Sequence, residues 1–214
     1  KGALVVMDNT WATPLYFRPH EHGVDISIQA GTKYLGGHSD INLGTISVNE
    51  AHYKRVLATH GDLGINPGPE DVYLALRGLR TMGVRLERHM ESGLRIAKWL
   101  QARPEVLRVL HPALENDPGH AIWKRDFSGA SGLFSFVLMP EAAGNIGAFF
   151  DSLALFGMGY SWGGFESLAI PFDCSSYRTA TKWAPGGPAV RLHIGLEDPD
   201  DLIEDLAAGL AKLS

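Results

Sequence analysis

The stretch Gln29-Ala30-Gly31-Thr32-Lys33-Tyr34-Leu35-Gly36-Gly37-His38-Ser39-Asp40 sets one lysine among glycines and other small residues. It directly follows an apolar run at Asp25 to Ile28, which predicts a buried strand. A lysine that is desolvated at the end of such a strand has a lowered pKa, and its free amine is the nucleophile that a Schiff base requires. Taken alone, the stretch is more typical of a glycine-rich turn whose lysine lies in solvent. Lys33 is therefore a candidate that the rest of the chain must support.

The residues before this stretch predict a strand, a helix and a second strand. Leu4 to Met7 reads as a fully buried parallel strand, and Arg18 to Gly23 reads as a short helix that ends at a glycine. Asp8 follows the first strand, at the position where open α/β sheets bind ligands, although an N-cap or an Asx turn explains an aspartate there equally well. Because a buried strand begins so close to residue 1, we expect this chain to be the C-terminal part of a longer protein.

The residues after this stretch predict two lobes of different kinds. A strand and a helix continue the first sheet, and a long amphipathic helix then leads to strands and helices typical of an antiparallel α+β lobe. We predict an α/β fold with a mostly parallel sheet over residues 1–80 and a smaller α+β domain over residues 81–214. The predicted strands are Gly44–Val48, Val106–Leu110, Leu133–Met139, Leu153–Met158 and Ala189–Ile194, and the predicted helices are Glu50–Thr59, Glu70–Leu79, Val84–Leu100, Asn145–Ser152 and Pro199–Leu213.

The composition is that of an ordinary globular protein, since 45% of the 214 residues are hydrophobic and 20% are charged. The formal net charge of −5 provides no basic surface for nucleic acid and no polybasic anchor for lipid. The sequence contains no apolar run of about 18 residues, so it predicts no membrane span. We therefore expect neither nucleic acid nor a membrane as a partner. The single cysteine, Cys174, cannot form an intrachain disulfide, and we expect a cytoplasmic protein.

Two common kinds of active site have little support in the sequence. The nine histidines are scattered without metal-ligand spacing, and His20 and His22 do not share a helical face, so we predict no metal site. The chain lacks a Gly-x-Ser-x-Gly motif, and Cys174 has no visible catalytic partner. Serine and cysteine hydrolase chemistry is therefore disfavoured.

A second glycine-rich stretch, Tyr160-Ser161-Trp162-Gly163-Gly164-Phe165-Glu166-Ser167-Leu168, follows a predicted strand. Two adjacent glycines allow the backbone to present N–H groups to an anion, although a structural turn is the simpler interpretation. Arg191 stands inside an apolar run, where a guanidinium is costly to bury without an acid to bind. A structural salt bridge and a ligand carboxylate both satisfy that requirement.

Four motifs in order resemble the Cys/Met metabolism enzymes, a family of fold-type-I pyridoxal phosphate proteins. The motifs are Asp8–Thr10, Thr32–Asp40, Ser161–Leu168 and Arg191–Glu197. The resemblance covers the whole chain and favours the functional interpretation of Lys33, Asp8 and Arg191. It implies that residues 1–80 are the C-terminal part of the large, cofactor-binding domain of this family.

Within the family, two segments most resemble the bacterial cystathionine β-lyases: Ser161 to Gly164 and Gly78 to Leu86. Relatives that act at the γ carbon usually have a leucine in place of Trp162. The phosphate loop of the family, and the residues that one subunit lends to its neighbour, lie upstream of Lys1. The resemblance therefore implies a homo-oligomer, a tetramer in the family, and possibly a partnership with an upstream fragment of the same protein.

The resemblance also implies a role for each site residue. Lys33 forms a Schiff base with pyridoxal phosphate, Asp8 pairs with the pyridinium nitrogen, and Thr32 hydrogen-bonds the phosphate. A protonated ring accepts electrons when the Cα–H bond of the substrate breaks. The residues that the resemblance assigns to the substrate are Arg191, which would bind the α-carboxylate, together with Ser161, Trp162 and Tyr160.

The implied substrate is an amino-acid thioether, and the implied reaction is β-elimination of L-cystathionine to homocysteine, pyruvate and ammonia. Lys33 would act first as a base and then as an acid. Three alternatives stay open. A γ-acting relative (cystathionine γ-lyase or synthase, methionine γ-lyase) would use the same catalytic residues. A cofactor-free Schiff-base lyase would need Lys33 but not Asp8, and a non-catalytic binding or regulatory protein can share the fold.

Overall fold

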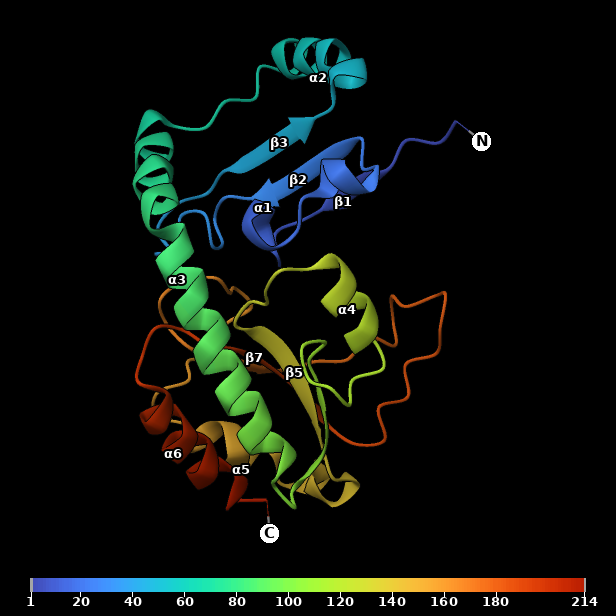
Figure 1. Ribbon diagram of the computed structural model, residues 1–214. Helices are drawn as coiled ribbons and strands as arrows, with labels where there is room; N and C mark the ends of the chain where they lie inside the picture. Colours follow the sequence, from blue (N-terminus) through green and yellow to red (C-terminus); the bar gives the residue numbers. More distant parts are fainter. Residues whose placement is uncertain (1, 214) are drawn as a thin grey trace.

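The computed structural model describes residues 2–213, which form two sheets joined by one long helix (Figure 1). The first sheet lies at the top of the view, and the second lies below it beside the C-terminal helix. The elements before the long helix are β1 (Val6–Asp8), α1 (Thr13–Tyr16), η1 (Pro19–His22), β2 (Ile26–Ala30), β3 (Gly44–Val48) and α2 (Glu50–Leu63). The others are α3 (Pro69–Gln101), β4 (Val106–Leu110), α4 (His120–Asp126), β5 (Leu133–Leu138), η2 (Pro140–Gly144), α5 (Ile146–Asp151), β6 (Leu168–Pro171), β7 (Ala189–His193) and α6 (Pro199–Leu210).

The first sheet has the strand order β1-β2-β3. β1 and β2 are parallel, with Asp8 opposite Ile28, so the carboxyl ends of both strands lie at the same edge. The Lys33 stretch follows β2 at that edge, as the sequence predicted. β3 runs antiparallel to β2, because the loop of residues 31–43 begins and ends at the same end of the sheet. The sheet is therefore mixed among the residues described.

The first strand is not buried in this chain. Leu4, Val5 and Val6 are 46%, 48% and 54% exposed. β1 lies at an edge of the sheet, where β2 is its one neighbour among residues 2–213. Helix α2 lies beyond β3 in Figure 1 and buries none of its own residues. The prediction of a fully buried strand at Leu4 to Met7 is therefore wrong for this chain.

Helix α3 is one continuous helix that runs past both sheets (Figure 1). Pro69 at its first position and acidic residues in its first turn favour that start. The sequence predicted a break between Leu79 and Val84, and this prediction is wrong. Met82 is buried there against Tyr34, and burial of this side chain offsets the low helix propensity of the adjacent glycine. The division proposed between residues 80 and 81 falls inside this helix and stays a proposal.

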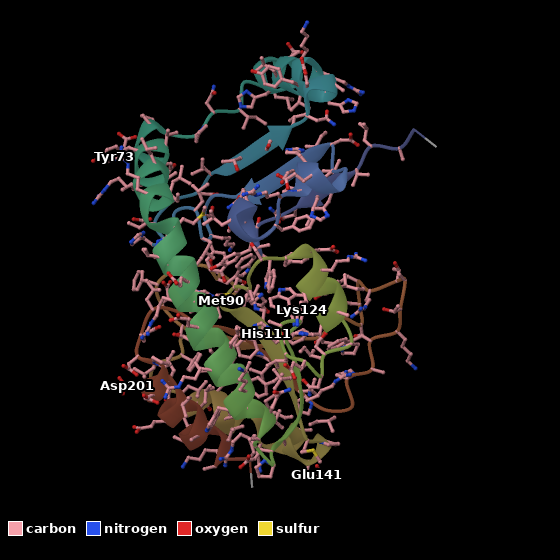
Figure 2. The ribbon with its side chains drawn as sticks, in the orientation of Figure 1. Tyr73, Met90, His111, Lys124, Glu141 and Asp201 are labelled. Carbon is pink, nitrogen blue, oxygen red and sulfur yellow. The ribbon has the colours of Figure 1, made fainter. Side chains whose placement is uncertain are left out.

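The second sheet is antiparallel throughout, with the order β4-β5-β7-β6. Its strands contribute to one large core, in which helices α3, α5 and α6 also bury apolar side chains. Figure 2 shows these side chains filling the space between the helices and the sheet. The core includes Ile96, Leu100, Phe136, Phe149, Leu192, Leu202 and Leu206. The predicted α+β character of this part of the chain is confirmed.

One predicted strand of this lobe is wrong. Leu153 to Met158 forms a single bridge, between Gly157 and Leu168, rather than a strand. The N–H groups of Ala154, Leu155 and Phe156 instead donate to the carboxylate of Asp205, at 2.8–3.2 Å. Because these donors are bound by a side chain of α6, they are not available to a neighbouring strand. No sequence pattern predicted the short elements α4 and β6.

Candidate active site

The Lys33 loop is held in place by close contacts with helix α3. The loop closes on itself, because the N–H of Gly37 donates to the Lys33 carbonyl at 2.8 Å. Gly78 of α3 approaches it so closely that a Cβ atom there would lie 2.3 Å from the carbonyl oxygen of Gly36. The buried guanidinium of Arg85 donates to the carbonyl of Leu35, at 3.3 Å. Gly37 and Gly78 therefore serve the packing of the loop against helix α3, since a Cβ atom at either would clash with the facing residues.

The amine of Lys33 faces the second glycine-rich stretch. Its Nζ lies 3.0 Å from the Oγ of Ser161 and 5.4 Å from the ring centroid of Trp162. Partial burial lowers the pKa of Lys33, and the nearby charge of Arg191 lowers it further. Among residues 2–213, Lys33 forms no ion pair with an acid. The site therefore favours the neutral, nucleophilic form of this amine more than water does.

Gly163 fixes the second stretch against the backbone of Lys33. Its φ is +82°, in the left-handed region that favours glycine. A Cβ atom there would lie 2.8 Å from the nitrogen of Tyr34 and 2.9 Å from the carbonyl carbon of Lys33. The N–H of Gly163 lies 3.1 Å from the Nε2 of His193. The paired glycines had suggested that their N–H groups bind an anion. The N–H of Gly163 instead points into the protein and is not available to one.

Arg191 lies on β7 and reaches the same stretch. Its Nη2 donates to the carbonyl of Tyr160 at 2.8 Å and lies 3.4 Å from that of Ser161. Burial lowers its pKa, and no carboxylate of residues 2–213 forms an ion pair with it. The structure thus gives no support for a structural salt bridge. A half-buried guanidinium without an acid is chemically suited to bind a ligand carboxylate.

Asp8 is exposed at the carboxyl edge of the first sheet. Its Oδ1 accepts hydrogen bonds from the backbone N–H of Thr10, at 2.8 Å, and from the Thr10 hydroxyl. The same hydroxyl accepts the N–H of Ala30 at 2.9 Å. Thr10 thereby links Asp8 to the end of β2, three residues before Lys33. The Oδ2 of Asp8 accepts no hydrogen bond from the part of the chain that the structure describes.

The predicted site residues fall into two groups. Lys33, Ser161, Trp162, Arg191 and Tyr160 are joined by the contacts given above. Asp8 and Thr32 lie at the carboxyl ends of the neighbouring strands β1 and β2. No hydrogen bond connects them to that group within residues 2–213. The Thr32 hydroxyl lies 3.5 Å from the Oδ1 of Asn42. Tyr160 is 83% exposed and contributes its carbonyl rather than its ring.

Sequence reasoning missed a buried cluster directly behind Lys33. Tyr34 is fully buried, and its ring contacts those of Trp162, His89 and His193 at centroid distances of 5.2–6.0 Å. Burial raises the pKa of Tyr34, whose hydroxyl accepts the N–H of Gly132 at 3.1 Å. A signal was present in the sequence. Arg191 and His193 are two residues apart on one strand, so they lie on the same face of the sheet.

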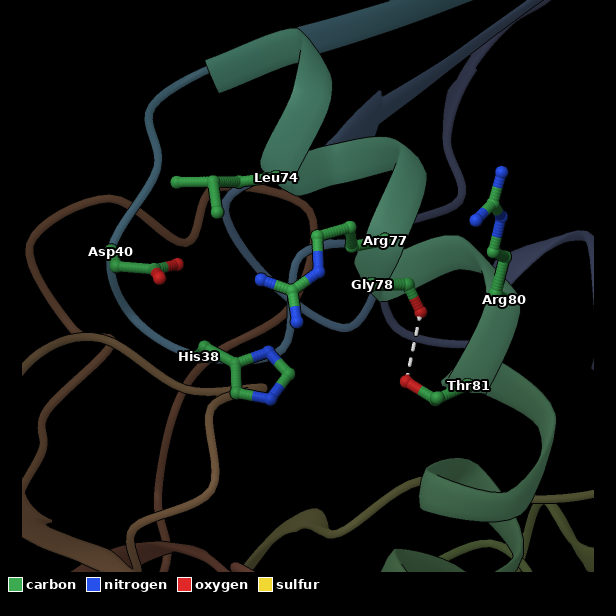
Figure 3. Close-up of a pocket in the computed structure, with 7 residues that line it drawn as sticks. All are labelled: His38, Asp40, Leu74, Arg77, Gly78, Arg80 and Thr81. Carbon is green, nitrogen blue, oxygen red and sulfur yellow. Dashed lines mark hydrogen bonds between the residues drawn. The ribbon is translucent and has the colours of Figure 1, made fainter. Parts of the chain in front are cut away.

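A separate cavity of about 380 Å³ lies between the far end of the Lys33 loop and helix α3 (Figure 3). In the figure the guanidinium of Arg77 points toward His38 and Asp40, whereas Arg80 points away from them. None of the predicted site residues lines this cavity. Within residues 2–213, no group of three or more His, Cys, Asp and Glu side chains is arranged to hold a metal ion.

Comparison with known proteins decides the family. The chain matches the family described as Cys/Met metabolism PLP-dependent enzyme over residues 1–211. The chain belongs to this family. It is 58% identical over its whole length to a putative cystathionine beta-lyase of Rhizobium johnstonii. It is also 49% identical, over 99% of its length, to the cystathionine beta-lyase of Salmonella typhimurium. The chain spans about half, 54%, of each of these relatives.

A solved structure supports the same assignment. The cystathionine gamma synthase from Xanthomonas oryzae pv. oryzae, in complex with cystathionine, superposes with a TM-score of 0.89. It is 35% identical, over 99% of this chain and 56% of that chain. The predicted family and the α/β fold class are confirmed, and the family is one of enzymes that depend on pyridoxal phosphate.

The residues present fit this cofactor. The amine of Lys33, whose pKa is lowered, suits the aldehyde of the cofactor. The free carboxylate oxygen of Asp8 suits the pyridine nitrogen, and the hydroxyl of Thr32, one residue before the amine, suits the phosphate. The cation of Arg191 adds a position for a substrate carboxylate beside Ser161. The donor set is therefore the one that the chemistry of pyridoxal phosphate requires.

Proposed function

We propose that the protein is a carbon–sulfur lyase that cleaves L-cystathionine by β-elimination into homocysteine, pyruvate and ammonia. The observation that carries this proposal is the convergence of two half-buried cations on one residue. Lys33 contacts the side chain of Ser161, and Arg191 contacts its carbonyl. An amine and a guanidinium without acidic partners, so placed, suit an amino acid with its α-carbon beside the amine and its carboxylate at the guanidinium.

Each residue of the site then has a distinct role. Pyridoxal phosphate, when bound, supplies an electron sink for the α-carbon of the substrate. Lys33 removes the proton at Cα and returns a proton to the departing sulfur, which its lowered pKa favours near neutral pH. Arg191 binds the α-carboxylate and Ser161 orients the amine of Lys33. Asp8 keeps the ring nitrogen protonated, and Thr32 holds the phosphate.

Trp162 supports β- rather than γ-elimination. Its indole stacks edge-on against Tyr34, at a centroid distance of 5.6 Å, and lies beside the amine of Lys33. Both reactions begin with the same proton removal at Cα. A γ-elimination also requires proton removal at Cβ and alignment of the Cγ–S bond, which needs more room beside the base. An indole held in that place narrows the space and favours presentation of the Cβ–S bond.

The second candidate is a γ-acting enzyme, because the similar solved structure is a cystathionine gamma synthase. The keto acid formed from cystathionine by the complete enzyme separates the two. Pyruvate with homocysteine supports the β-lyase, whereas mainly 2-oxobutyrate with cysteine supports the γ-acting alternative. In the same assay Trp162→Leu should raise the share of 2-oxobutyrate, and Trp162→Phe, which keeps an aromatic ring, should raise it less.

The proposal extends to assembly and location. The first sheet exposes apolar side chains along β1, and the sheet and α2 line a further cavity of about 920 Å³. An exposed strand edge of this kind pairs readily with other chains. We therefore include a homo-oligomer and contact with an upstream fragment of the same protein in the proposal. We also propose a cytoplasmic location. Among residues 2–213, no helix is long and apolar enough to cross a membrane.

A further inference from the structure

A buried histidine, His193, contacts the backbone of the second glycine-rich stretch. His193 lies on β7 and is 1% exposed. Its Nε2 is 3.1 Å from the N–H of Gly163 and 3.0 Å from the carbonyl oxygen of Gly164. One imidazole nitrogen cannot accept from the first and donate to the second at the same time. The position of the ring proton therefore decides which of these two contacts is a hydrogen bond.

A second buried histidine packs against the first. The Nδ1 of His89 is 2.7 Å from the carbonyl oxygen of Ile194, which can only accept, so His89 carries its proton on Nδ1. The Nε2 of His89 is then a bare acceptor, and it is buried without a partner, as is the Nδ1 of His193. The two rings have centroids 5.3 Å apart. In either tautomer the Nε2 of His193 therefore bonds the backbone of the second glycine-rich stretch, as an acceptor from Gly163 or as a donor to Gly164.

The surroundings keep both rings neutral. Burial lowers the pKa of His193 to about 3 and that of His89 to about 4, and the nearby Arg191 and Arg85 lower them further. The groups packed around the pair are aromatic or cationic: Tyr34, Lys33 and the two arginines. Near neutral pH, His193 is therefore an uncharged ring that bonds this stretch through its Nε2.

We infer that His193 is a positioning residue, whose Nε2 bonds the backbone of Gly163 and Gly164 and thereby fixes the stretch that carries Ser161 and Trp162 against Lys33. This inference rests on the proposed function of that site. Gly163 is the point at which the stretch touches the Lys33 backbone, as its missing Cβ shows. The residues on its amino side contact the amine of Lys33 and the guanidinium of Arg191. Loss of the hydrogen bond frees the stretch and misplaces the carboxylate site. The loop that carries Lys33 keeps its conformation.

The test uses the complete holoenzyme and three variants. His193→Ala removes the nitrogen that bonds this backbone, and His193→Gln returns a polar group, because the Gln amide oxygen can accept from Gly163 while its NH₂ donates to Gly164. His111→Ala is the matched control, since His111 is equally buried and its pKa is also lowered to about 4 by burial. Figure 2 places His111 beside the second sheet, where its Nδ1 accepts the N–H of Ala113.

Two measurements are read together. Amide hydrogen exchange of the peptide that covers residues 160–168 should become about tenfold faster in His193→Ala and stay near the wild-type rate in His193→Gln and His111→Ala. The KM for cystathionine should rise about tenfold in His193→Ala with a smaller change in kcat, and the Gln variant should restore it.

The exchange measurement separates this inference from the proposed reaction. If the wild-type enzyme does not act on cystathionine, the exchange rates still test the hydrogen bond. Unchanged exchange over residues 160–168 in His193→Ala would overturn the inference. So would equal losses in His193→Ala, His193→Gln and His111→Ala, because His193 would then serve only the packing of the core.

Discussion

Replacement of Gly163 by alanine tests the contact between the two glycine-rich stretches. The alanine must adopt a φ near +82°, which costs about 1–2 kcal/mol for an L-residue. Its Cβ would also lie 2.8–2.9 Å from backbone atoms of Tyr34 and Lys33, which cannot rotate away as a side chain does. Such overpacking costs about 1–3 kcal/mol. We therefore expect Gly163→Ala to lower the free energy of unfolding by roughly 2–5 kcal/mol in total.

A second glycine separates the two contributions. Gly23 has a φ of +80°, almost the same as that of Gly163, but no atom lies within 4 Å of where its Cβ would stand. Gly23→Ala therefore carries the conformational cost of about 1–2 kcal/mol without the steric one. The difference between the two variants measures the close contact alone. Denaturant unfolding of the complete protein, with wild type and both variants side by side, gives both free energies.

The same pair of variants should differ in activity. In Gly163→Ala the strain falls on the backbone of Lys33, and a displacement of about 1 Å at a reacting group lowers the rate by about 100-fold. We expect a loss of that size in kcat/KM for cystathionine, and an almost unchanged value in Gly23→Ala. Equal stabilities for the two variants, with full activity in both, would refute the close contact of Gly163 with Lys33.

Three further changes test other parts of the site. Arg191→Lys loses the bidentate guanidinium, so carboxylate binding should weaken by about 1.5–3 kcal/mol, which substrate affinity measures; an unchanged affinity with an intact fold would make Arg191 structural. Thr10→Val removes the hydroxyl that joins Asp8 to Ala30, so stability should fall by about 1–3 kcal/mol and cofactor affinity should fall with it; a cofactor affinity equal to wild type would contradict the role of Thr10. His111 is held neutral because burial lowers its pKa to about 4, so the stability it contributes is fully present above its unfolded pKa of about 6.5 and is lost as the pH falls toward 4. Between pH 7 and pH 5 the wild type should therefore lose about 2 kcal/mol more stability than His111→Asn, and equal losses would argue against a buried neutral ring.

Local motifs in the sequence predict the candidate site, because they carry the residue types that its chemistry needs. Lys33, Ser161 and Arg191 each stand in a pattern whose residue types suit a cofactor or a carboxylate, and the structure brings these three together. The buried cluster behind them was not predicted, because the spacing of Arg191 and His193 places both on one face of a strand but does not indicate which residues pack against His193. His89 and His193 meet only through the packing of α3 against the second sheet.

Two of the errors in the fold have the same physical origin. The predicted strand at Leu153 to Met158 is apolar enough, but the carboxylate of Asp205, on a helix far along the chain, takes its N–H groups. The predicted break in α3 follows from a weak local propensity at Gly83, which tertiary burial of Met82 overrides. Local patterns could not report either contact, because both depend on residues distant in sequence.

The position of the cofactor on Lys33 is the central claim, and borohydride reduction tests it most directly. Reduction of the complete holoenzyme fixes the cofactor to the lysine that binds it, and peptide mapping by mass spectrometry then identifies that lysine. The structure predicts the mass of the reduced cofactor on the peptide that contains Thr32, Lys33 and Tyr34. Label on any other lysine, with Lys33 unmodified, would contradict the account.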